Sequence, residues 1–175
     1  RLDAGGGALV PTLVEVLDAF GERIPFNLEL KRGSRGEYPG MEAAAVEAAA
    51  RRGLLEQTLF SSFYPPVLEA LREVSPEVRI AVLVSPKFPQ GAVERARLLA
   101  AEALNPERSL ASRELVEAAH GEGMAVYVYT VDDQEEMQRL LDLGVDGLFT
   151  NHPRRMREML AARQPSDAAA RPSFA

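Results

Sequence analysis

The sequence contains no cysteine, which excludes disulfide bonds, thiol catalysis and cysteine-ligated zinc, and leaves the redox state of the compartment open. Lys and Arg total 20 against 26 Asp and Glu, and the formal net charge is −6. No basic cluster offsets this charge. Nucleic acid is therefore not an expected partner, because binding to a phosphate backbone requires a basic surface. No apolar run approaches the roughly 18 residues of a membrane-spanning helix.

What is present is typical of a globular protein. The 175 residues are 46% hydrophobic and 26% charged, and this length can bury one sizeable core. We therefore expect one domain over residues 1–160. Residues 1–10 are glycine-rich and are expected to form a loop, and residues 161–175 are expected to form a disordered tail because they lack apolar periodicity. The sequence leaves the compartment and the oligomeric state undecided.

Strands and helices alternate along the chain. A capping box at Thr12 and Glu15 predicts a helix that Gly21 ends. Six strands are expected at 24–31, 57–63, 78–84, 101–105, 124–131 and 145–150, and each is followed by a helix, the third of which starts at Val67 after two prolines. This order predicts a parallel sheet with right-handed crossovers.

The strand at 24–31 has one polar face. Side chains of a strand alternate between its faces, so Asn27, Glu29 and Lys31 share one face and the apolar residues between them share the other. Glu29 could hold a metal ion there and Lys31 could meet an anion. A structural Glu–Lys ion pair at the strand end explains the same spacing, and the spacing does not separate the two interpretations.

The two kinds of connection differ in composition. Turns from helix to strand contain glycine, whereas the strand-to-helix loops carry polar side chains such as Lys31, Ser62 and Asn105. Active sites of (β/α)8 barrels lie on the strand-to-helix side, although an open doubly wound sheet would show a similar asymmetry. A complete barrel has eight strands in about 250 residues, so the first two β/α units are expected to be absent from this chain.

At this point the sequence resembles the glycerophosphodiester phosphodiesterase family over residues 1–160. Any one matching stretch is short, but the stretches occur in the family's order. They are 2–5 (LDAG), 11–17 (PTLVEVL), 26–31 (FNLELK), 61–63 (SSF), 104–106 (LNP), 129–132 (YTVD) and 144–151 (GVDGLFTN).

The resemblance implies a TIM-like (β/α)8 barrel of the phospholipase C-like phosphodiesterase type. It implies cleavage of glycerophosphodiesters to glycerol 3-phosphate and an alcohol, with a Ca²⁺ or Mg²⁺ ion. Glu29 matches the family's metal-binding glutamate and Lys31 matches the lysine that faces the phosphate. Tyr129 stands where the family usually has tryptophan, in the wall of the glycerol pocket.

Three further residues are candidate substrate contacts: Ser62, Phe63 and Asn105. The strand register decides whether Ser61 or Ser62 reaches the pocket, and the sequence does not fix that register. Asn105 precedes a proline, where asparagine commonly caps or turns the chain, so a structural role competes with substrate binding.

The family's His-Arg-Gly strand, its Glu-x-Asp metal pair and its second catalytic histidine belong to the absent units. His120 ends a helix before a glycine, and His152 follows a strand end, so we expect structural roles for both. With one metal ligand and no histidine pair, this chain alone is expected to be inactive. The alternatives are a catalytically dead partial barrel used for binding or assembly, and a Schiff-base lyase built on Lys31, which nearby Glu29 disfavours because it keeps the amine charged.

Overall fold

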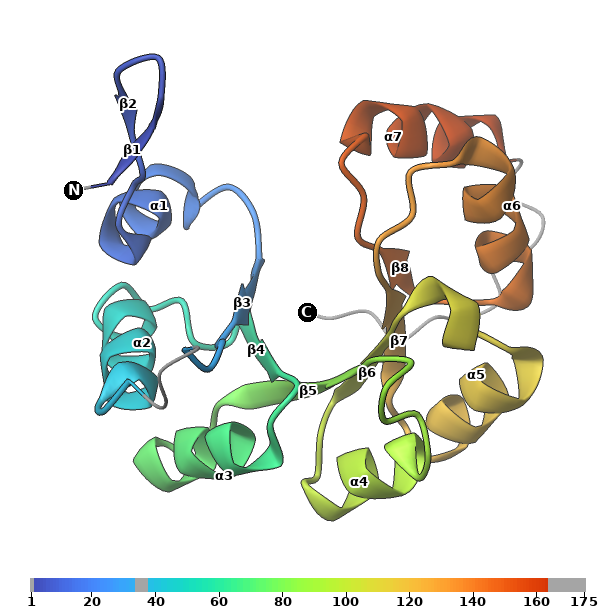
Figure 1. Ribbon diagram of the computed structural model, residues 1–175, viewed down its shortest axis with the longest axis horizontal. Helices are drawn as coiled ribbons and strands as arrows, with labels where there is room; N and C mark the ends of the chain where they lie inside the picture. The colour runs from blue at the N-terminus through green and yellow to red at the C-terminus, as the bar shows by residue number, and fades with distance from the viewer. Residues whose placement is uncertain (1, 34–37, 164–175) are drawn as a thin grey trace. The chain divides into compact units, whose positions relative to one another are not determined.

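The computed structural model describes residues 2–33 and 38–163 of the chain (Figure 1). Residues 34–37, within the loop that precedes the second helix, and residues 164–175 of the expected tail lie outside the described residues. The chain divides into two compact units, Arg1–Ala81 and Val82–Ala175, and the division falls within strand β5. The units are described separately below.

The first unit begins with two short strands and then alternates helices with strands. Its elements are β1 (Asp3–Gly5), β2 (Ala8–Leu9), α1 (Leu13–Phe20), β3 (Phe26–Glu29), α2 (Met41–Ala50), β4 (Thr58–Ser62), α3 (Pro65–Val74) and the start of β5 (Arg79–Val84).

The loop expected over residues 1–10 is wrong at its centre. β1 and β2 pair antiparallel, with Asp3 opposite Leu9. Gly5, Gly6 and Gly7 have φ angles of 103°, 60° and 82°, which residues with a side chain rarely adopt. The glycines that suggested a flexible linker therefore form the reversal of a hairpin.

Helix α1 starts as its capping box predicts, and it ends for a reason the sequence did not reveal. The Thr12 hydroxyl accepts a hydrogen bond from the Glu15 amide, and the Glu15 carboxylate accepts one from the Thr12 amide. Gly21 has a right-handed φ of −56°, not the left-handed angle expected of a C′ glycine. A Cβ at Gly21 would lie 2.5 Å from Leu54 Cδ1 and 2.7 Å from Leu17 O, so close packing requires glycine here.

Strands β3 and β4 are parallel and bring the polar face of β3 beside β4. Their register pairs Asn27 with Leu59 and Glu29 with Ser61. Beneath them, Leu17, Phe60 and Leu68 are almost entirely buried. α3 starts at Pro65, two residues earlier than expected, because proline is tolerated in the first helical turn, where no backbone donor is needed.

The second unit continues the alternation of strands and helices. It contains the end of β5, α4 (Ala92–Leu98), β6 (Ala103–Pro106), the short 3₁₀ helix η1 (Arg108–Leu110), α5 (Arg113–Gly121), β7 (Ala125–Val128), α6 (Gln134–Leu143), β8 (Gly147–Leu148) and α7 (Pro153–Ala162).

The strands follow chain order in the sheet, β3-β4-β5-β6-β7-β8, and the pairs β3–β4, β6–β7 and β7–β8 are parallel. The six strands expected from the sequence are all present. β7 and β8 are shorter than expected because residues beyond them leave the ladder for side-chain bonds; the Asn151 amide, for example, donates to the Asp132 carboxylate. None of the described helices is long and apolar enough to cross a membrane.

Candidate functional site

The carboxyl ends of β3 and β4 carry three polar side chains on one face. Residues paired in a parallel ladder point to the same side, so Ser61 shares the face of Asn27 and Glu29. The Ser61 hydroxyl lies 2.6 Å from Asn27 Oδ1 and donates to it. The structure thus fixes the register that the sequence left open, and Ser61 is the serine that lies beside Glu29.

Glu29 and Lys31 form an ion pair, with Lys31 Nζ 2.6 Å from Glu29 Oε1. The side chain of Lys31 is 72% exposed and that of Glu29 is 31% exposed. An exposed pair of this kind contributes about 0–1 kcal/mol to stability, so an anion or a cation could displace either partner at small cost. The pair places an ammonium and a carboxylate together at the end of β3, as the strand spacing predicts.

Ser62 and Phe63, the other candidates of this strand end, differ in accessibility. The Ser62 side chain is buried: its hydroxyl donates to Leu30 O at 2.8 Å and accepts from the Tyr64 amide at 3.2 Å. Phe63 follows β4 and is 38% exposed. Ser62 therefore already has two backbone partners, whereas Phe63 presents part of its ring to a ligand.

A cation that sequence reasoning missed lies after this strand. The Arg32 guanidinium is 5.2 Å from the centre of the Tyr64 ring. A guanidinium within about 6 Å of an aromatic face is attracted to it. The sequence offered no signal for this contact, because nothing in the spacing of Arg32 and Tyr64 predicts that they meet.

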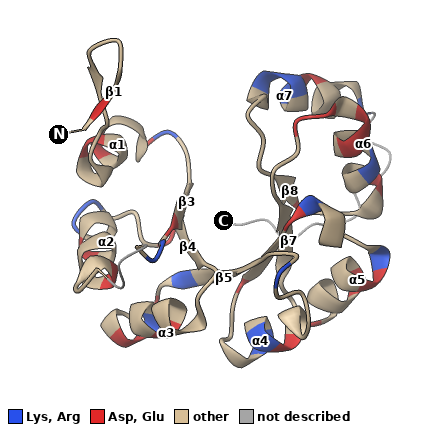
Figure 2. Ribbon diagram, in the orientation of Figure 1, with Lys and Arg blue, Asp and Glu red and all other residues tan. Residues whose placement is uncertain are grey.

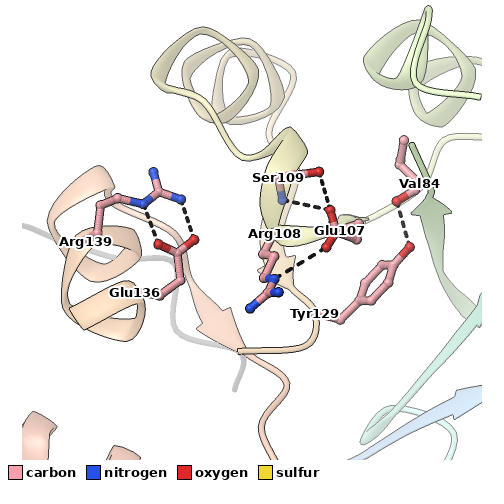
Figure 3. A network of polar contacts seen from close by, with 7 residues as sticks. All are labelled: Val84, Glu107, Arg108, Ser109, Tyr129, Glu136 and Arg139. Atoms are coloured by element: carbon pink, nitrogen blue, oxygen red, sulfur yellow. Dashed lines mark hydrogen bonds and ion pairs between the residues drawn. The ribbon is translucent and has the colours of Figure 1, made fainter. Parts of the chain in front are cut away.

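In the second unit, Tyr129 reaches from the end of β7 to β5. Its hydroxyl donates to Val84 O at 2.8 Å, and its backbone forms a parallel bridge with Glu107 (Figure 3). The Glu107 carboxylate accepts from the Ser109 amide at 2.8 Å and lies 3.6 Å from the Arg108 guanidinium. These bonds hold the β6–η1 turn beside the tyrosine.

Charges of both signs are spread over the helices of this unit (Figure 2). Arg139 donates two hydrogen bonds of 2.8 Å to Glu136 (Figure 3). These bonds hold the pKa of Glu136 below its usual range and raise the pKa of Arg139, and Arg108 lowers the pKa of Glu136 further. Glu136 thus stays ionised, and its role is to pair with arginine.

Asn105 is fully buried in β6, and neither Oδ1 nor Nδ2 has a hydrogen-bond partner. Buried amides are nearly always paired, so this side chain is unusual in the described structure. The structural alternative, a cap or turn before the proline, would give the amide a backbone partner, and it has none.

The motif at the ends of β7 and β8 is structural. Asp132 accepts hydrogen bonds from the Thr150 hydroxyl at 3.0 Å, and from the backbone and side-chain amides of Asn151 at 2.8 and 2.9 Å. The Asn151 bonds are the main reason why the pKa of Asp132 is lowered, and the charge of His152 adds to the effect. The carboxylate ties the start of the α7 connection to the end of β7.

Both histidines of the chain lie where structural roles are expected. His120 Nε2 is 2.9 Å from Asp146 Oδ2, and the same oxygen accepts from the Val126 amide at 2.8 Å. His152 is the N-cap residue of α7, and its backbone amide donates to the Thr150 hydroxyl. Neither imidazole lies next to another titratable group that would make an acid–base pair.

The described residues do not make a metal site by themselves. Within residues 2–33 and 38–163, no three His, Asp or Glu side chains gather into one. Glu29 supplies one carboxylate, which Lys31 already neutralises. A hollow of about 870 Å³ between α6 and α7 is lined mainly by charged residues and contains none of the candidates named above.

Comparison with known proteins gives one consistent result. The family model described as "Glycerophosphoryl diester phosphodiesterase family" matches residues 2–155. A glycerophosphodiester phosphodiesterase of Bacillus subtilis is 32% identical over 157 residues, which cover 84% of this chain and 53% of that protein. One of Caldanaerobacter subterraneus is also 32% identical, covering 87% of this chain and 65% of that protein. The chain thus spans between about half and two thirds of the length of these curated relatives.

Solved structures show the same likeness. The structure of a putative glycerophosphodiester phosphodiesterase from Galdieria sulphuraria superposes with a TM-score of 0.82 at 28% identity, covering 92% of this chain and 68% of that one. An Oleispira antarctica phosphodiesterase solved with the product sn-glycerol-3-phosphate gives 0.75 at 26% identity, covering 87% and 62%.

Proposed function

This chain belongs to the glycerophosphoryl diester phosphodiesterase family, and we propose that the complete protein hydrolyses glycerophosphodiesters to glycerol 3-phosphate and an alcohol. The observation that carries the proposal is the Glu29–Lys31 pair at the carboxyl end of β3. Charged groups at the strand ends of such α/β folds are in position to bind a ligand, and an exposed ammonium suits a phosphodiester anion. The product bound to the Oleispira relative is of the same chemical class.

In this proposal Lys31 stabilises the phosphoryl oxygens. Negative charge on these oxygens rises as water attacks phosphorus, so a fixed ammonium lowers the barrier more than it strengthens substrate binding. Because Lys31 is 72% exposed and its pair with Glu29 is weak, it can turn to the phosphate without a large loss of stability.

Glu29 is proposed as one ligand of a Ca²⁺ or Mg²⁺ ion in the complete protein. Both ions prefer oxygen ligands and need several of them. The described residues supply one, so the remaining carboxylates, together with the general acid and base, would come from the two β/α units that we propose precede this part of the chain. This chain alone is then expected not to turn over substrate.

Phe63 and Tyr129 are proposed to contact the organic part of the substrate, each from its own unit. Ser61 is proposed as a polar contact beside Glu29, in preference to Ser62, because the Ser62 hydroxyl is committed to Leu30 O and the Tyr64 amide. Phe63 is the aromatic residue of that strand end and is 38% exposed.

The experiment measures release of glycerol 3-phosphate from glycerophosphocholine by the complete protein, with and without EDTA. Lys31→Met is expected to lower kcat about 100-fold or more, since loss of one group that stabilises transition-state charge costs that much. Lys87 is exposed and is the other lysine of the chain, so Lys87→Met is the matched control and should leave the rate unchanged.

Glu29→Gln tests the proposed ligand, with exposed Glu22→Gln as its control. Loss of release in EDTA and in Glu29→Gln supports metal dependence through Glu29. Full release in EDTA would refute the metal, and full release by Lys31→Met would refute the role of Lys31. Absence of release from the complete wild-type protein would favour the alternative, a barrel that binds without catalysis.

A further inference from the structure

The amide of Asn105 is the buried group whose chemistry the fold does not use. The side chain is 0% exposed, and its Oδ1 and Nδ2 lack partners. Folding thus removes two donors and an acceptor from water without replacing their bonds, which is unfavourable. Leucine has a similar volume and would avoid this penalty, so packing does not account for asparagine at this position.

The strand register shows which side chains surround this amide. β6 and β7 pair Ala103 with Ala125 and Leu104 with Val126, and a bridge joins Glu107 to Tyr129. Continued by one residue, the ladder places Asn105 beside Tyr127. Because paired residues of parallel strands point to the same side, Asn105 and Glu107 share one face with Tyr127 and Tyr129.

The two tyrosines of that face lean in opposite directions. The ring of Tyr127 lies over β8, because a Cβ built on Gly147 would approach its Cδ1 to 2.9 Å. Tyr129 leans the other way: its hydroxyl donates to Val84 O of β5 at 2.8 Å (Figure 3). Since β6 lies between β7 and β5, the Tyr129 ring crosses β6 on the face that Asn105 occupies.

We propose that the Asn105 amide recognises a hydroxyl of the glycerol part of the substrate, and that Tyr129 covers it until substrate displaces the phenol from Val84. The inference rests on the proposed function, since it names a group that reads the substrate. A hydroxyl donates and accepts one hydrogen bond each, which matches Oδ1 and Nδ2. The amide is uncharged, so it selects a polyol and not the phosphate.

The covering bond sets a threshold for binding. A ligand that needs Asn105 must first break the bond between Tyr129 and Val84, and the apparent affinity falls by the fraction of protein in which that bond is open. Removing the phenol oxygen should therefore tighten binding. The opposite result, weaker binding, is expected if Tyr129 only supports the sheet.

The experiment compares two substrates of the complete protein: glycerophosphocholine, which carries glycerol, and bis(p-nitrophenyl) phosphate, which does not. In Asn105→Leu the ratio of the two kcat/KM values should fall about tenfold, the effect of one lost hydrogen bond of ordinary strength. The melting temperature of the same variant should rise, because its buried site no longer holds unpaired polar atoms. Asn105→Ala repeats the kinetic test should the leucine variant fail to fold.

Tyr129→Phe should lower KM for glycerophosphocholine about fivefold, since it removes one hydrogen bond of the covered state. Tyr127→Phe, on the same face and strand, is the control and should leave KM unchanged. An unaltered substrate ratio in the Asn105 variants, or a lower melting temperature in Asn105→Leu, would show that the amide serves a structural water and would overturn the inference alone. A wild-type protein that releases no glycerol 3-phosphate would instead overturn the proposed function.

Discussion

Replacing Ser62 with alanine separates a structural hydroxyl from a substrate contact. The Ser62 side chain is fully buried; it donates to Leu30 O at 2.8 Å and accepts from the Tyr64 amide at 3.2 Å. Alanine removes both bonds, and the Leu30 carbonyl, in a residue that is 4% exposed, is left without water. At about 1 kcal/mol for each bond, the free energy of unfolding should fall by about 2 kcal/mol.

Ser61→Ala is the matched control. Its hydroxyl donates to Asn27 Oδ1 at 2.6 Å, and Asn27 is only half-buried, so water can replace the lost donor. The free energy of unfolding should fall by less than about 1 kcal/mol. Urea unfolding measures both values, and an unchanged slope with denaturant shows that stability alone has moved.

The same two variants, made in the complete protein, also report on substrate. Ser61→Ala should raise KM for glycerophosphocholine more than Ser62→Ala does. A stable Ser62→Ala variant with a raised KM would refute this reasoning and restore the original expectation that Ser62 contacts the substrate.

Two further predictions concern backbone packing and acid stability. Gly21→Ala should destabilise the fold by about 1–3 kcal/mol, because its Cβ would lie 2.5 Å from Leu54 Cδ1, whereas Gly121→Ala meets nothing within 4 Å and should be neutral or stabilising by up to about 1 kcal/mol; urea unfolding compares the pair. Asp132 has a lowered pKa because Asn151 donates to it, so its contribution to stability is complete above the unfolded pKa of about 4 and is lost as the pH falls through the lower folded value. The melting temperature of Asp132→Asn should therefore lie below that of wild type at pH 7 and approach it at pH 2; a constant difference would contradict this.

The element order could be predicted from the sequence because local signals agree with it. The capping box at Thr12, the alternation from Phe26 to Lys31 and the apolar run ending at Val84 each predicted an element that is present. Residues 3–9 were missed because three glycines are compatible with both a linker and a tight reversal, and only the pairing of Asp3 with Leu9 separates these.

The candidate site was predictable only as far as side-chain alternation reaches. The common face of Glu29 and Lys31 follows from a period of two residues, and their ion pair confirms it. The choice between Ser61 and Ser62 depends on how two strands align, which is a long-range property. The unpaired state of Asn105 is likewise invisible in the sequence, because it depends on which atoms of β5 and β7 come near.

The contact between Tyr127 and Gly147 has an evolutionary consequence. The tyrosine ring occupies the space that any side chain at position 147 would need, and a Cβ there would come within 2.9 Å of it. A change at either position alone either creates a clash or opens a gap, so neither substitution is readily accepted first. The two positions should therefore vary together among relatives, with a small residue at 127 wherever 147 carries a side chain.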